Sequence, residues 1–110
     1  MAVISSDGEL NSRVQVICDR FKNYFSPEFL SDTGEALEFI TYELPEVSLI
    51  NFSDAMIDPE QLMERIASDP WLHYGGVVGV HRRKDAARAA ELSRRSNIVS
   101  LIPRGEFVWG

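Results

Sequence analysis

The sequence predicts a single α/β domain, residues 1–110, in which helices cover a parallel five-stranded sheet. Short apolar runs alternate with helical stretches along the whole chain, and this alternation is typical of a parallel sheet. The chain has 110 residues, of which 45% are apolar, and this is enough for one hydrophobic core. No apolar run approaches membrane length, so we expect no membrane span and a cytoplasmic location.

The first half of the chain predicts two strands and two helices. A short strand at residues 2–4 precedes a capping box, in which Ser6 caps a helix and Glu9 reaches back. Leu10, Val14, Ile17, Cys18 and Phe21 then follow helical spacing and predict one apolar face. A weaker strand at residues 24–30 contains a proline, which suits the edge of a sheet. A second helix begins at Asp32 or Thr33 and ends at Pro45.

The second half predicts three strands and two helices. The strand at residues 47–52 has the strongest signal, and Asp58-Pro59 then marks a helix that runs to about residue 68. A very apolar strand at residues 76–80 precedes an alanine-rich helix at residues 85–95, and a last strand covers residues 98–102. This succession is that of a flavodoxin-like, doubly wound sheet with strand order 2-1-3-4-5.

The helix that would flank the last strand of such a sheet is missing, since the sequence ends at residue 110. Two explanations stay open. Either the chain is a domain from a longer protein, or a second subunit covers apolar surface near Phe107 and Trp109.

Charge is distributed unevenly. Residues 1–81 carry 4 basic and 14 acidic side chains, whereas residues 82–110 carry 7 basic and 3 acidic ones. Such a chain can orient a charged partner or its own copy. Cys18 is the single cysteine, so no internal disulfide is expected, and we expect a buried thiol.

Four segments together resemble the receiver domains of bacterial two-component response regulators. They are AVISSDGEL near the start, VSLINFSDAMID in the middle, ASDPWLHYGGVVGV after the third helix, and SLIP near the end. The resemblance covers residues 2 to about 107 and rests on the order and spacing of these segments. It implies a phosphoryl-accepting site at the carboxyl ends of the strands, with an acidic pair for magnesium, an aspartate nucleophile, a hydroxyl and a lysine.

This chain departs from the implied pattern at every one of those positions. The acidic pair falls on Ser5 and Ser6, the phosphoacceptor on Asn51, the hydroxyl on His81 and the lysine on Ile102, just before a proline. A carboxamide neither attacks phosphorus nor holds a metal well. We therefore expect a degenerate pocket with no catalytic residue, no metal and no cofactor.

One alternative interpretation keeps the ability to accept a phosphoryl group. Asp54 lies three residues after Asn51, and Asp7 lies one residue after Ser6. If these two carboxylates face each other near the strand ends, they form an atypical phosphoacceptor site with a divalent metal. Against this interpretation, Asp54 falls in a loop and no lysine is nearby.

The remaining polar residues favour binding over catalysis. The stretch from His81 through Lys84 is either an anion-binding loop or an ordinary basic surface, and neither His81 nor His73 has metal-ligand spacing or a nucleophile partner. We expect a pseudo-receiver that is not an enzyme: a phosphorylation-independent interaction module of bacterial signal transduction. Its partner would be a signalling or output domain, or a second copy as a homodimer, rather than nucleic acid. The candidate interaction face consists of Arg82, Arg83, Arg88, Arg94, Arg95, Phe107 and Trp109.

Overall fold

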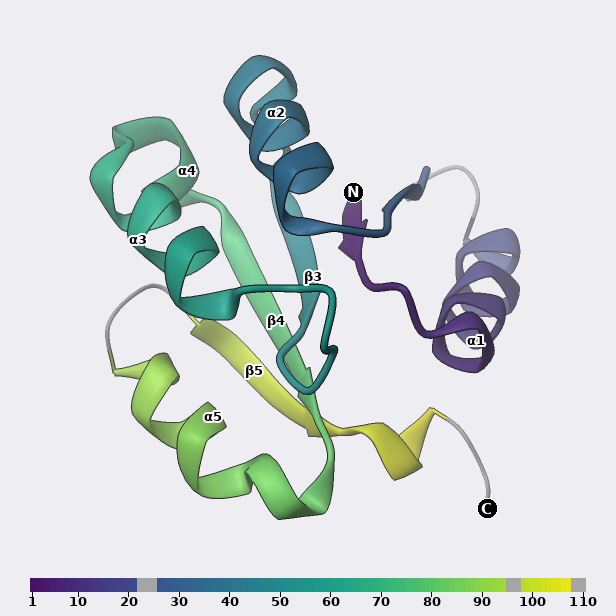
Figure 1. The fold of residues 1–110 in the computed structure, drawn as a ribbon. Helices are drawn as coiled ribbons and strands as arrows, with labels where there is room; N and C mark the ends of the chain where they lie inside the picture. Colours follow the sequence, from purple (N-terminus) through teal and green to yellow (C-terminus); the bar gives the residue numbers. More distant parts are fainter. Residues whose placement is uncertain (22–25, 95–97, 108–110) are drawn as a thin grey trace.

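The computed structural model describes residues 1–21, 26–94 and 98–107, and its core is one parallel five-stranded sheet (Figure 1). The strands are β1 (Ala2–Ile4), β2 (Glu28–Leu30), β3 (Val47–Asn51), β4 (Gly76–His81) and β5 (Ile98–Pro103). Their order across the sheet is β2-β1-β3-β4-β5. The predicted fold class and strand order are therefore confirmed.

Helices cover the two faces of the sheet unequally (Figure 1). One face carries α2 (Thr33–Glu43), α3 (Pro59–Ser68), α4 (Pro70–Tyr74) and α5 (Ala86–Ser93), whose buried side chains form the larger core cluster. The other face carries α1 (Gly8–Arg20), which buries Leu10, Val14 and Cys18 against the sheet. In the described part of the chain, β5 is followed by the 3₁₀ turn η2 (Arg104–Glu106).

Aspartates begin each of the first four helices, and two details differ from the prediction. Asp7, not Ser6, caps α1, because its carboxylate accepts the backbone N–H of Leu10. The short helix α4 was not predicted, although Asp69-Pro70 repeats the Asp58-Pro59 signal that begins α3.

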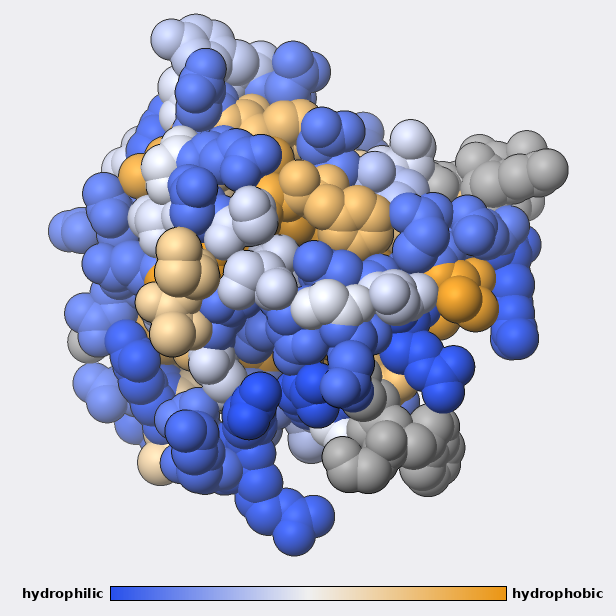
Figure 2. Space-filling model, turned by 45° about the vertical axis from the view of Figure 1, so that its right-hand side comes forward, coloured by the Kyte–Doolittle hydropathy of each residue, from blue (hydrophilic) through white to orange (hydrophobic). Residues whose placement is uncertain are grey.

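The apolar face of α1 is narrower than its spacing predicts. Ile17 is 45% exposed and Phe21 is 50% exposed, while Cys18 is buried as expected. Burial raises the pKa of the Cys18 thiol. Within the described ranges α1 is the one helix on this face, and it contacts the sheet along one stripe, so the flanking apolar side chains face solvent. In the view of Figure 2, apolar residues form separate patches within a mostly hydrophilic surface.

No helix among the described residues is long and apolar enough to cross a membrane.

Candidate functional site: the carboxyl edge of the sheet

The carboxyl ends of β1, β3, β4 and β5 meet at one edge of the sheet. Parallel register pairs Ile4 with Ile50, Asn51 with Val80, and His81 with Pro103. Ser5, Asn51, His81 and Ile102 thus come from neighbouring strand ends, where open α/β sheets place their ligands. The structure brings the positions of the predicted pocket together.

Asn51 is 3% exposed, and both the nitrogen and the oxygen of its side-chain amide make hydrogen bonds. Its Nδ2 donates to Ser5 Oγ at 3.3 Å, and its Oδ1 accepts the backbone N–H of Ser53 at 3.2 Å. A neutral amide can remain buried with these partners, whereas a carboxylate at the same place would need a compensating cation. The site is built around an uncharged residue.

Ser5 is fully buried and connects the first loop to this amide. Its Oγ also accepts the backbone N–H of Asp7 at 3.1 Å, and its carbonyl oxygen accepts Asn11 Nδ2 at 2.9 Å. Its hydroxyl is therefore used inside the protein, and the small side chain leaves no carboxylate for a magnesium ion at this position.

Asp54 reaches across the edge from the loop after β3. Ser6 Oγ is 2.7 and 2.8 Å from the two carboxylate oxygens of Asp54, and the backbone N–H of Ser6 also donates to this carboxylate. A further donor is the backbone N–H of Met56 at 2.9 Å. Asp54 thus ties the loop after β3 to the loop after β1, and it faces Ser6 rather than Asp7.

Asp7 instead pairs with Arg104, a cation that sequence reasoning missed. Arg104 Nε donates to Asp7 Oδ2 at 2.6 Å and Nη2 donates to Oδ1 at 3.3 Å, with both side chains less than one-fifth exposed. The hydrogen bond from Arg104 is the main cause that lowers the pKa of Asp7 below its usual range, against the opposing effect of burial. The available signal was a basic residue directly after Pro103, two positions beyond Ile102.

The other two predicted pocket positions carry neither the hydroxyl nor the lysine that the resemblance implies. His81 is 8% exposed, and its Nδ1 lies 3.0 Å from the Arg82 carbonyl oxygen, to which it donates. Ile102 is half-buried in β5 and pairs with Val80. Ser53 is a second missed residue, since its Oγ accepts the backbone N–H of Arg82 at 2.7 Å and joins the β3 and β4 ends.

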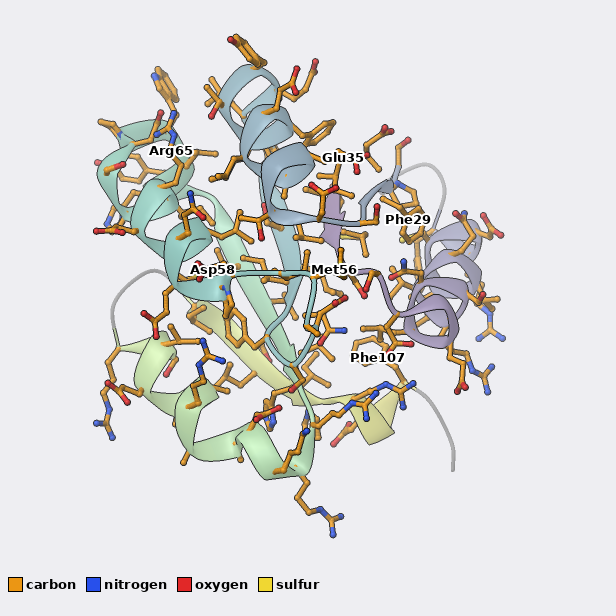
Figure 3. The ribbon with its side chains drawn as sticks, in the orientation of Figure 1. Phe29, Glu35, Met56, Asp58, Arg65 and Phe107 are labelled. Carbon is orange, nitrogen blue, oxygen red and sulfur yellow. The ribbon has the colours of Figure 1, made fainter. Side chains whose placement is uncertain are left out.

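The predicted interaction face is not one surface. Arg82, Arg83, Arg88 and Arg94 are exposed on and beside α5, and Arg88 Nη2 lies 3.8 Å from Glu60 Oε1. Phe107 packs on the opposite face of the sheet, next to α1 (Figure 3), because η2 turns the chain away from α5 after β5. Arg95 and Trp109 lie outside the described residues.

Among the described residues, no group of three His, Cys, Asp or Glu side chains is placed to hold a metal ion.

Comparisons with known proteins agree on the fold. No protein-family model matches the sequence, and no curated protein sequence matches it. Several solved structures are similar, and three of them follow. A response regulator from Hahella chejuensis has a TM-score of 0.82 at 10% identity, covering 96% of this chain and 80% of that one. A two-component response regulator from Legionella pneumophila has a TM-score of 0.72 at 13% identity, covering 93% and 83%.

The third is the bacteriophytochrome response regulator AtBRR, with a TM-score of 0.69 at 13% identity, covering 99% of this chain and 93% of that one. The likeness spans nearly the whole chain while few residues are shared, so it concerns the fold and not the site. The chain therefore has the fold of a response-regulator receiver domain.

Proposed function

We propose that the chain is a pseudo-receiver, a non-enzymatic module that binds other proteins without being phosphorylated. The observation that carries this proposal is the buried Asn51, whose amide is satisfied by Ser5 and Ser53 at the edge where a nucleophilic carboxylate would be needed. Phosphoryl transfer to a protein requires a nucleophile and cations that neutralise developing charge. Here the nucleophile is replaced, and the nearby Arg104 is already paired with Asp7.

Internal contacts would hold the domain in one state. Asp54 joins the loops after β1 and β3 through Ser6, and Ser53 joins the loop after β3 to the end of β4. The Asp7–Arg104 pair joins the loop after β1 to η2, beyond the end of β5. These contacts occupy the polar groups that would otherwise respond to a phosphoryl group, so no such group can bias the equilibrium between two states.

The binding surface of this module would be the exposed basic side of α5 and the turn before it. Arg82, Arg83 and Arg94 are exposed there, next to small alanine side chains that leave the helix surface accessible. Such a surface would steer an acidic partner, such as a signalling or output domain, through long-range attraction.

The test is incubation of the intact chain with acetyl phosphate and magnesium, followed by intact-mass measurement. We expect no gain of a phosphoryl group at any time point, because no positioned carboxylate is free to attack. A functional receiver domain treated in parallel provides the positive control. A stable added phosphoryl group that maps to an aspartate would refute the proposal.

A second candidate is an atypical phosphoacceptor at Asp54. It is favoured by the position of this carboxylate at the same sheet edge, over Ser6. Attack by Asp54 would require breaking its contacts with Ser6 and with the backbone of Met56. In the same experiment this function predicts a phosphorylated chain whose added mass is lost in the Asp54→Asn variant.

A further inference from the structure

An aromatic groove lies at the opposite edge of the sheet, where β3 and β4 begin. We call it the aromatic groove, and its volume is about 450 Å³. Its lining consists of Leu44, Pro45, Glu46, Trp71, Tyr74 and Gly75. Trp71 is 77% exposed and Tyr74 is 86% exposed. Two aromatic rings that face solvent beside a groove of this size are typical of a binding surface.

The groove is preformed by two backbone segments in close contact. The N–H of Gly76 donates to the carbonyl oxygen of Glu46 at 2.8 Å. A Cβ at Gly75 would lie only 2.9 Å from that same oxygen, so a side chain there would force the two segments apart. Leu44 adopts a left-handed conformation with φ 46°, which is unfavourable for a residue with a side chain and ends α2 beside the groove.

The chemistry of the lining selects a cation. The faces of Trp and Tyr rings attract cations, with Trp the strongest, and the lining also includes Glu46, an exposed acidic residue. An arginine satisfies both requirements, because its planar guanidinium stacks on aromatic rings and pairs with a carboxylate. The exposed Glu43, just before Leu44, adds to the negative charge.

The same chain carries such cations at the far end of β4. The last residue of that strand is His81. It is followed directly by three exposed residues, Arg82, Arg83 and Lys84, which we call the basic turn. Gly75 of the aromatic groove directly precedes β4. The six residues of β4 therefore separate the groove from the basic turn by about 20 Å. Figure 1 shows this polarity, with α4 near the start of β4 and α5 near its end. One copy cannot bring its own turn into its own groove.

We propose that the aromatic groove binds the basic turn of a second copy of this chain. The contact is heterologous, since different surfaces of the two copies meet, and it can repeat from copy to copy along the strand direction. A single turn in a groove buries little area, so the association is weak and sensitive to salt.

This inference deepens the proposed function by naming a partner for the basic side of the module. It rests on the module's role in binding and not on the loss of phosphoryl transfer. The two proposals can be refuted independently. An added phosphoryl group would refute the pseudo-receiver, whereas only the sedimentation experiment decides whether the copies associate.

The test is sedimentation velocity of the whole chain over a range of concentrations, with two variants that complement each other. The groove variant is Trp71→Ala with Tyr74→Ala, and the turn variant is Arg82→Glu with Arg83→Glu. All four side chains are exposed, so the fold should tolerate the changes. Ile17→Ala, on the far side of the sheet, is the control for the groove variant, because it also removes an apolar side chain from the surface, one that is 45% exposed.

We expect the average mass of the wild-type chain and of Ile17→Ala to rise with concentration and to fall with added salt. Each complementary variant alone should stay monomeric. An equimolar mixture of the two should form dimers and stop there, since it retains one intact groove and one intact turn per pair. A monomeric wild-type chain, association of either variant alone, or a mixture that fails to pair would each overturn the proposal.

Discussion

An Asp7→Ala variant is expected to lose about 3 kcal/mol of unfolding free energy. The substitution leaves Arg104 without the carboxylate that it contacts at 2.6 Å in a mostly buried position, and loss of one partner of a buried ion pair is costly. It also removes the N-cap of α1, which costs about 1 kcal/mol by itself. Urea denaturation with a fixed m-value measures the change.

Two comparisons test the contribution of the ion pair. Asp7→Asn keeps a capping oxygen but removes the charge, so it should lose less than Asp7→Ala. Arg88→Ala removes an exposed pair with Glu60 at 3.8 Å and should change stability by less than about 0.5 kcal/mol. Equal small losses for Asp7→Ala and Arg88→Ala would mean that the Asp7–Arg104 pair does not hold the edge together.

The same pair gives a pH dependence with a definite sign. Because Arg104 lowers the pKa of folded Asp7, the stabilisation is fully present above the unfolded pKa of about 3.9 and is lost as pH falls through the lower folded value. The stability difference between the wild-type chain and Arg104→Met should therefore be constant near neutral pH and shrink below about pH 4.

A Gly79→Ala variant is expected to lose about 2 kcal/mol, which corresponds to a fall of roughly 10 °C in Tm. A Cβ at Gly79 would lie 2.8 Å from Leu101 Cδ2 and 2.9 Å from Phe52 Cζ. Phe52 is 3% exposed within the larger core cluster, so its ring has little room to move. Thermal unfolding followed by circular dichroism measures the change.

Gly105→Ala is the control for this prediction, because a Cβ at Gly105 would meet no atom within 4 Å. Its Tm should stay close to that of the wild-type chain. An equal Tm for Gly79→Ala would show that the Phe52 ring is not fixed above β4, and the packing that places Asn51 beside it would need revision.

Local signals predicted most of the fold. Alternating apolar runs identified all five strands, and Asp58 with Pro59 identified the start of α3, because caps and strand patterns depend on residues close in sequence. Asp69 with Pro70 carried the same signal for α4, but the five-residue helix is too short to show periodicity. Ser6 was assigned as the cap of α1 because its spacing from Glu9 also fits a capping box, although Asp7 makes the contact.

Contacts between distant residues were not predictable in the same way. Asp7 and Arg104 are 97 residues apart, and nothing local to either residue reports their contact. The sequence correctly located Asn51 at the end of β3 but did not predict its hydrogen-bond partners. Ser5 becomes a partner through the register of β1 against β3, and Ser53 through the loop that follows β3. The aromatic groove depends in the same way on the contact between Glu46 and Gly76.

The most direct test of the pseudo-receiver is an amide NMR titration of the chain with magnesium and beryllofluoride, a mimic of the phosphoryl group. If internal hydrogen bonds already occupy the polar groups at the carboxyl edge of the sheet, the mimic should not bind there. The backbone amide signals of Ser5, Ser6, Asn51 and Ser53 should then not shift in the titration. Saturable shifts centred on these residues, and extending to α5, would show a pocket that binds the mimic and changes state, and would contradict the account.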